Sequence, residues 1–254
     1  MLTIITINFN NSDGLRKTLE SISLQECNEV FEHIIIDGAS SDNSHKIIKK
    51  YVMQNNHVKF LTEKDNGIYN AMNKGLALSR QNFVAFLNAG DLLADKTSLQ
   101  NIFLRLSSKR SVDLLYSNLV LVNQTGVITR KWNSGRFQRW KLYIGWMPPH
   151  PMTAIRRDLI MELAGFNEYF RISADYDLML RALIQPGIKV DYLNEVIVKM
   201  EAGGVSNGSL SSILHSNFEV MKSWIGIVGL AAPYWIFVIK PLSKIFQLFK
   251  GFNK

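Results

Sequence analysis

The sequence of 254 residues contains only one cysteine, Cys27, so it cannot form an internal disulfide or a cysteine-based zinc site. It also lacks a Gly-x-x-x-x-Gly-Lys-Ser/Thr loop and a Gly-x-Gly-x-x-Gly fingerprint after its first apolar run, which argues against P-loop and dinucleotide sites. The first residues have no basic segment ahead of the apolar ones, so we expect a first β-strand there and not a signal peptide. A reducing cytosol is the expected compartment.

The apolar content of 47% is ample for a packed core and fits one large α/β domain with a small appendage. The net charge of +8 is unevenly distributed. Residues 209–254 contain five lysines and a single acid, Glu219, and therefore hold +4 of that charge. The same segment is strongly apolar, which favours an anionic membrane surface over nucleic acid as its partner.

Apolar runs alternate with helical patterns in the first half of the chain, which predicts βαβ units and a mostly parallel sheet flanked by helices. The expected strands are residues 2–9, 33–37, 58–61 and 83–91. The alternation loosens after about residue 110. There the sequence predicts a hairpin around the Asn-Gln-Thr-Gly turn at 123–126, with further strands and helices up to about residue 200. The last of these are two short strands, at 188–192 and 196–200.

The end of the chain reads as a helical tail. Residues 224–239 carry no charge, but sixteen residues are short for a membrane crossing, which needs about 20. Residues 240–254 interleave lysines with apolar residues, a pattern typical of a helix that lies in the membrane interface. The alternative is a helix packed on the globular core or on a second subunit, which leaves a homo-oligomer open.

Acids follow three successive predicted strands. Asp37 ends one strand, Asp65 lies just beyond the next, and Asp91 ends the strand predicted over 83–91. Each alone would be an ordinary turn residue, but the carboxyl ends of parallel strands meet in one crevice. Several carboxylates in such a crevice suit Mg²⁺ or Mn²⁺ shared with a phosphorylated ligand.

A set of motifs at the expected spacing resembles family 2 glycosyltransferases of the GT-A fold. In the first half these are residues 6–10 (TINFN), 35–42 (IIDGASSD), 63–75 (EKDNGIYNAMNKG) and 87–91 (LNAGD). In the second half they are residues 149–151 (PHP), 165–168 (GFNE), 174–178 (ADYDL) and 203–206 (GGVS). The resemblance covers about residues 1–210. It implies a GT-A domain at 1–208, with a nucleotide-sugar half at 1–110 and an acceptor half at 111–208, followed by a membrane-associating tail at 209–254.

The resemblance also implies roles for individual residues. Six residues are implied to bind the donor nucleotide-sugar through their side chains or backbone: Thr6, Asn8, Asp37, Asp65, Asn73 and Lys74. Asp91 corresponds to the metal-binding acid of the DXD motif, with Asn88 in its weaker first position. Asp175 corresponds to the general base of a Glu-Asp motif whose first residue is Ala174 here.

Other residues are expected to line the site. Asp177 is the rival base. Residues two positions apart on a helix point in directions about 200° apart, so only one of Asp175 and Asp177 can face the site. His150, held between two prolines, is expected to contact acceptor or leaving phosphate or to serve the loop structurally. Gly204 belongs to a loop that would close the site.

The implied activity is inverting transfer of a hexose or N-acetylhexosamine from a UDP-sugar, with Mg²⁺ or Mn²⁺, to a saccharide on a polyprenyl diphosphate. This is the chemistry of bacterial polysaccharide assembly, for example of lipopolysaccharide, at the cytoplasmic face of the membrane. Two alternatives stay open. One is transfer to a polyprenyl phosphate, and the other is a non-catalytic nucleotide-sugar-binding scaffold.

Overall fold

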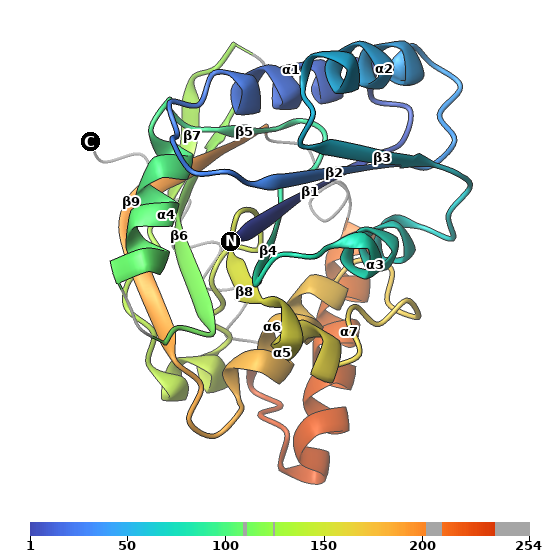
Figure 1. Ribbon diagram of the computed structural model, residues 1–254. Coiled ribbons are helices and arrows are strands. Elements are labelled where there is room, and N and C mark those ends of the chain that lie inside the picture. Colours follow the sequence, from blue (N-terminus) through green and yellow to red (C-terminus); the bar gives the residue numbers. More distant parts are fainter. Residues whose placement is uncertain (109–110, 124, 202–209, 237–254) are drawn as a thin grey trace.

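The computed structural model describes residues 1–108, 111–123, 125–201 and 210–236 (Figure 1). One curled sheet of nine strands forms its centre, in the order β3-β2-β1-β4-β8-β6-β9-β5, with β7 paired to β6. The strands are β1 Leu2–Asn8, β2 Glu32–Asp37, β3 Val58–Thr62, β4 Phe83–Phe86, β5 Asp91–Leu93, β6 Leu114–Val122, β7 Ile128–Trp132, β8 Ala154–Arg156 and β9 Val190–Glu201.

The four strands of the N-terminal half pair in parallel, with β1 between β2 and β4. The isoleucine-rich sequences of β1 and β2 are buried on both faces, as the centre of a parallel sheet requires. Beyond β4 the sheet is mixed. The strand β8 is antiparallel to β4 and β6, β9 is parallel to β6, and β5 is antiparallel to β9.

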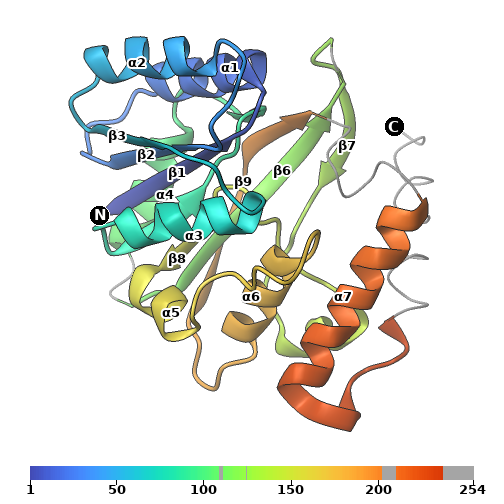
Figure 2. The same ribbon diagram turned by 90° about the vertical axis from the view of Figure 1, so that its right-hand side faces the viewer.

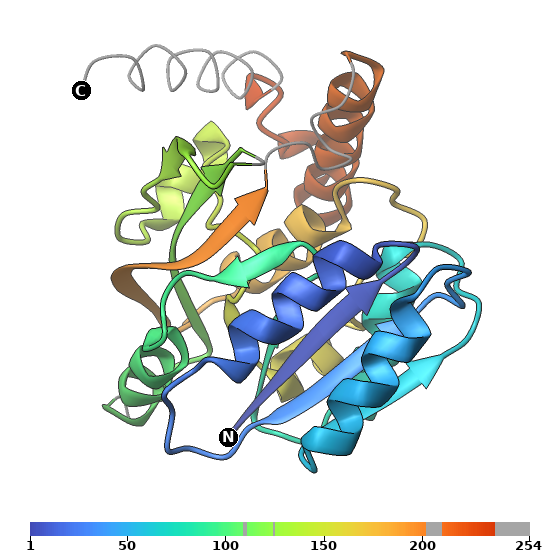
Figure 3. The same ribbon diagram turned by 90° about the horizontal axis from the view of Figure 1, so that it is seen from above.

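Helices cover both faces of the sheet. The helices are α1 Ser12–Ser23, α2 Ser44–Gln54, α3 Ile68–Leu78, α4 Ser98–Ser108, α5 Arg157–Glu162, α6 Ala174–Leu183 and α7 Leu210–Val228, with 3₁₀ turns at η1 Arg139–Ile144 and η3 Gly229–Ala231. Viewed from above, α1 and α2 lie over the β1–β3 half (Figure 3), whereas α3, α5 and α6 lie beneath it (Figure 1). Alternate residues of β1 therefore enter different cores: Ile5 packs with α3 and α6, and Ile4 packs with α1 and α4.

The α/β fold class and the hairpin at 123–126 are confirmed. Two expected elements differ from the prediction. Residues 83–91 do not form one strand, because the chain leaves β4 after Phe86 and turns at Gly90, whose φ of 106° favours glycine. Asp91 consequently begins β5, paired with Met200 of β9. The two short strands expected at 188–192 and 196–200 are one strand, β9, with an irregular register opposite Ser117 and Asn118 of β6.

Helix α7 packs along α6 (Figure 2), although it lies beyond the domain boundary predicted at residue 208. Trp224 is fully buried, and its indole N–H donates to the hydroxyl of Tyr176 at 3.0 Å. Val220 and Met221 are buried in the same core. Within the described ranges, no helix combines the length and the apolar character that a membrane crossing requires.

Candidate active site

The loops that follow β1 and β2 are tied together by one buried amide. Asn8 lies at the end of β1, and its side-chain N–H₂ donates to Asp37 Oδ1 at 2.7 Å and to Ser44 Oγ at 2.8 Å. Asp37 also accepts from the hydroxyl and backbone N–H of Ser40. Asp37 is fully buried, and its carboxylate braces the 38–41 loop. Asn8 Oδ1 is buried without a hydrogen-bond partner.

Asp65, just beyond the end of β3, lies against the same loop at Gly38. A Cβ on Gly38 would lie 2.5 Å from Asp65 Oδ2 and 3.0 Å from Phe9, so only glycine permits this approach. The Asp65 side chain is half-buried, whereas Phe9 is 63% exposed. Sequence reasoning overlooked Phe9, although an aromatic residue directly after a buried strand was a visible signal. Asp65 and Phe9 therefore lie together over Gly38 at the carboxyl edge of the sheet.

Two of the predicted donor residues, Thr6 and Lys74, have partners within the protein. The hydroxyl of Thr6 is fully buried and lies 3.0 Å from Nε2 of His33, whose pKa burial lowers to about 3. Only the backbone of Thr6 is left for a nucleotide contact. Lys74 donates to the carbonyl of Lys64 at 2.7 Å and pairs with Glu63 at 2.8 Å, so it fixes the loop before α3.

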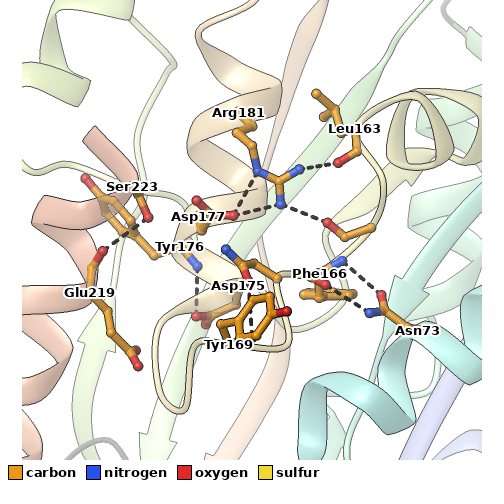
Figure 4. Close-up of polar contacts among 12 residues, drawn as sticks. Asn73, Leu163, Phe166, Tyr169, Asp175, Tyr176, Asp177, Arg181, Glu219 and Ser223 are labelled. Atoms are coloured by element: carbon orange, nitrogen blue, oxygen red, sulfur yellow. Dashed lines mark hydrogen bonds and ion pairs between the residues drawn. The ribbon is translucent and has the colours of Figure 1, made fainter. Parts of the chain in front are cut away.

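Asn73 joins the two halves of the molecule. Its amide donates to the carbonyl of Phe166, and its oxygen accepts from the backbone N–H of Phe166 (Figure 4). The same amide also donates to Glu168. All three distances are 2.8–2.9 Å. Asn73 therefore fastens the 165–168 loop, from the second half of the chain, onto α3 in the first half.

Asp91 is a buried acid, only 9% exposed. Burial raises its pKa to about 7, although a backbone hydrogen bond from Asn88 opposes part of that rise. Thr18 of α1 holds the turn before it, donating to the Asp91 carbonyl at 2.8 Å and accepting from the Gly90 N–H at 2.9 Å. In the part of the chain that the structure describes, Asp91 has no ion-pair partner.

The Asn88–Asp91 turn fits a hard divalent cation as a partial ligand set. Asn88 Oδ1 is buried without a hydrogen-bond partner, and the Asp91 carboxylate lacks a counter-charge. Carboxylate and amide oxygens are the donors that Mg²⁺ and Mn²⁺ take. Among the described residues, no group of three or more acidic, histidine or cysteine side chains is arranged to hold a metal. Most ligands would therefore come from a substrate and water.

Asp175 occupies the first turn of α6 and is half-buried. Its Oδ1 accepts from the backbone N–H of Tyr176 at 2.8 Å and lies 3.5 Å from the hydroxyl of Tyr69 on α3. That hydroxyl donates to the carbonyl of Ile172 at 2.6 Å. Burial, with the charge of Asp175, raises the pKa of Tyr69, which keeps the phenol protonated. Asp175 is thus an available carboxylate held against the nucleotide half.

Asp177, unlike Asp175, is not an available carboxylate. Its carboxylate is buried against Arg181, 2.7 Å away, and Arg181 also donates to the carbonyls of Leu163 and Gly165 (Figure 4). Both side chains line a cavity of about 450 Å³ between the 163–170 loop and α7. Of the two candidate bases, the structure leaves Asp175 available.

His150 lies beneath the same region. Its ring stacks on Phe86 at 5.2 Å and meets Phe166 edge-on at 5.6 Å. Burial lowers the pKa of His150, and the charge of Asp175 opposes that shift. The ring is therefore neutral near pH 7, and its Nε2 is buried without a partner. Gly204, the remaining predicted site residue, lies outside the described residues.

Comparison with known proteins points to one family. The family model described as glycosyl transferase family 2 matches residues 3–164. A PGL/p-HBAD biosynthesis glycosyltransferase of Mycobacterium bovis is 28% identical over 209 residues, which covers 82% of this chain and 79% of that protein. A glycosyltransferase of Methanocaldococcus jannaschii is 24% identical over 234 residues, covering 88% of this chain and 79% of that one.

Solved structures share the fold. TarS of S. aureus (residues 1–349) in complex with UDP has a TM-score of 0.73 and 17% identity, covering 96% of this chain and 71% of TarS. The mannosyltransferase PcManGT of Pyrobaculum calidifontis in complex with GDP-Man and Mn²⁺ has a TM-score of 0.65 and 14% identity, covering 98% of this chain and 72% of that one.

Proposed function

The chain belongs to glycosyl transferase family 2, and from this premise we propose an inverting, metal-dependent transfer of a sugar from a UDP-sugar to a lipid-linked saccharide. The observation that carries the proposal is the position of Asp175. This available carboxylate is held by Tyr69 against the half of the molecule that contains the β1–β3 loops. One acid facing a donor site is what single displacement at an anomeric carbon requires.

The pair formed by Phe9 and Asp65 over Gly38 is the proposed nucleotide site. An exposed aromatic ring stacks on a base, and a carboxylate accepts hydrogen bonds from base or ribose. Asn8 Oδ1, a buried acceptor without a partner among the described residues, lies at the end of β1, directly before Phe9. Unsatisfied buried polar atoms are costly and recur at functional sites, which supports a ligand at this edge. The choice of UDP is supported by the TarS structures solved with UDP and with UDP-GlcNAc.

In the proposed reaction, Asp175 takes the proton of the acceptor hydroxyl as that oxygen bonds to the anomeric carbon, and the bond to the diphosphate breaks on the opposite side. Asp91 and Asn88 would hold Mg²⁺ or Mn²⁺, which supplies neutralisation of the negative charge on the leaving diphosphate. The Mn²⁺ in the mannosyltransferase structure supports this assignment. His150, neutral and with Nε2 unpartnered, is positioned to hydrogen-bond a hydroxyl near Asp175.

The proposed acceptor is a saccharide on a polyprenyl diphosphate, reached at the cytoplasmic face of a membrane. Support comes from the lysine-rich apolar sequence of residues 237–254. It also comes from exposed aromatic residues at η1 and just before that segment, Trp140, Tyr143 and Trp235. Trp and Tyr of this kind are enriched at membrane interfaces.

Truncation after Ile236 tests the membrane assignment. Ile236 and Trp224 are buried in the core, so this end point leaves the packing of α7 intact, whereas removal from residue 224 would not. We expect the truncated protein to lose binding to vesicles containing phosphatidylglycerol while it keeps its melting temperature. Full binding by the truncated protein would contradict the assignment.

The activity itself is tested with a panel of UDP-sugars and a synthetic polyprenyl-diphosphate saccharide, with and without EDTA. We expect acceptor-dependent UDP release with one donor, loss of turnover in EDTA and inverted anomeric configuration in the product. Higher turnover with polyprenyl phosphate would favour the alternative acceptor. Binding of a UDP-sugar without turnover on either acceptor would favour a non-catalytic scaffold.

A further inference from the structure

Glu219 is the one acid of the α7 segment, and it is almost completely buried. Its carboxylate accepts from three consecutive backbone N–H groups: those of Arg171 at 2.6 Å, Ile172 at 3.0 Å and Ser173 at 2.8 Å. The fourth partner is Nε2 of His215, one turn earlier on α7, at 3.1 Å. Three successive amides turned toward one carboxylate form a fixed anion-binding arc, which α7 fills.

The 171–173 segment leads directly into the first turn of α6, where Asp175 lies. It is held on one side by Glu219 of α7 and on the other by Tyr69 of α3, which donates to the Ile172 carbonyl at 2.6 Å. Ser173 adds a contact to α7, with its hydroxyl 2.8 Å from that of Ser216. Since Ser173 is the residue directly before α6, the position of this segment determines where the helix begins and where its Asp175 carboxylate lies.

We propose that Glu219 is a positioning residue for sugar transfer: by clamping the backbone of residues 171–173, it fixes the start of α6 and aims Asp175 at the acceptor hydroxyl. The inference rests on the proposed role of Asp175 as general base. It gives Glu219, in a segment that the sequence placed in a membrane-associating tail, a positioning role next to the proposed base.

The arrangement is specific for a carboxylate. The arc presents donors only, so both oxygens of the side chain must accept: Oε1 from Arg171 and His215, and Oε2 from Ile172 and Ser173. A glutamine at this position would turn an N–H₂ group toward part of the arc and leave at least one buried N–H without a partner. The volume of the side chain and the packing of Trp224 would stay the same.

The test compares Glu219→Gln with His215→Ala in the full-length protein. The histidine variant removes the most exposed partner and leaves the three backbone hydrogen bonds in place. For Glu219→Gln we expect kcat to fall roughly 10- to 100-fold, the range that about 1 Å of misplacement costs. The UDP affinity and the KM for the donor should be unchanged, because the donor residues lie on other elements. For His215→Ala we expect a kcat close to that of the wild type.

A folded Glu219→Gln protein with wild-type kcat would overturn the inference, and so would a loss of kcat that only follows the folded fraction measured by circular dichroism. If Glu219→Gln does not fold, Glu219→Asp takes its place. Glu219→Asp keeps the charge but shortens the side chain by one methylene, so its carboxylate no longer reaches all of its partners. We expect it to lower kcat as well, and a wild-type kcat would overturn the inference. The variant Asp175→Asn separates the two proposals. An inactive Asp175→Asn beside a fully active Glu219→Gln refutes only the clamp, whereas an active Asp175→Asn refutes the proposed base and the clamp with it.

Discussion

Replacing Asp91 with asparagine should make the metal-free protein more stable and its stability less dependent on pH. The Asp91 carboxyl is buried without an ion pair in the described ranges, and its pKa is raised from 3.8 to about 7. Well below pH 3.8 the acid is protonated in both the folded and the unfolded chain, so it contributes no difference. As the pH rises to 7, the unfolded chain ionises first and folding must keep a proton on Asp91, so stability falls.

The size of the effect follows from the shift. The pKa of Asp91 rises by about three units, and each unit is worth about 1.36 kcal/mol. Above pH 7 the ionisable group therefore lowers the free energy of unfolding by at most about 4 kcal/mol. Asparagine carries no charge and keeps the shape of the side chain. We therefore expect the free energy of unfolding of Asp91→Asn to exceed that of the wild type by about 2–4 kcal/mol at pH 8 and by much less at pH 4.5.

Urea denaturation in EDTA at pH 4.5, 6 and 8 measures this difference directly. Mn²⁺ added at pH 8 should stabilise the wild type and leave Asp91→Asn unchanged, because ligands that bind only the folded state raise its stability. The neighbouring exposed acid Asp95→Asn is the control, since it should show neither effect. A stability difference between wild type and Asp91→Asn that is the same at all three pH values would refute the reasoning.

Three further substitutions test separate parts of the structure. Asp177→Asn breaks the buried pair with Arg181 and should cost about 3–5 kcal/mol in urea denaturation while leaving the kcat of the folded protein unchanged; a large fall in kcat would return Asp177 to the list of candidate bases. Trp224→Ala should cost about 3–5 kcal/mol in the same assay, and a cost near zero would mean that α7 is not packed in the core. Phe9→Ala should raise the Kd for UDP by roughly fivefold, measured by calorimetry, if the ring stacks on the base at about 1 kcal/mol; an unchanged Kd would place the base elsewhere.

The parts of the fold that were predictable depend on local patterns. The runs of β1 and β2 are continuous and apolar, and each is followed by polar loop residues, so strand, helix and parallel pairing followed from short windows. The acids at strand ends were found in the same way. Asp65 lies against Gly38 as a shared crevice requires, whereas Asp91 is bonded to α1 and to β9 and joins no acidic cluster among the described residues.

The parts that were not predictable depend on contacts between distant segments. The pairing of Asp91 with Met200 joins residues more than one hundred positions apart. Asn88, Gly90 and Asp91 are residue types common in turns, but they do not tell which distant strand the chain joins after that turn. Glu219 reads as one acid in a basic, apolar tail until the N–H groups of residues 171–173 are placed around it. The choice of Asp175 over Asp177 likewise needed Arg181, whose partner the helical spacing alone leaves open.

The central claim is that Asp175 serves as the base of a sugar transfer. The most direct measurement compares Asp175→Asn with Asp158→Asn, an exposed aspartate in the first turn of α5, in acceptor-dependent UDP release with Mn²⁺. The account predicts that Asp175→Asn loses about 10²–10⁴-fold in kcat, the usual contribution of a general base, while it binds UDP as the wild type does and Asp158→Asn stays fully active. An Asp175→Asn protein that keeps wild-type turnover would contradict it.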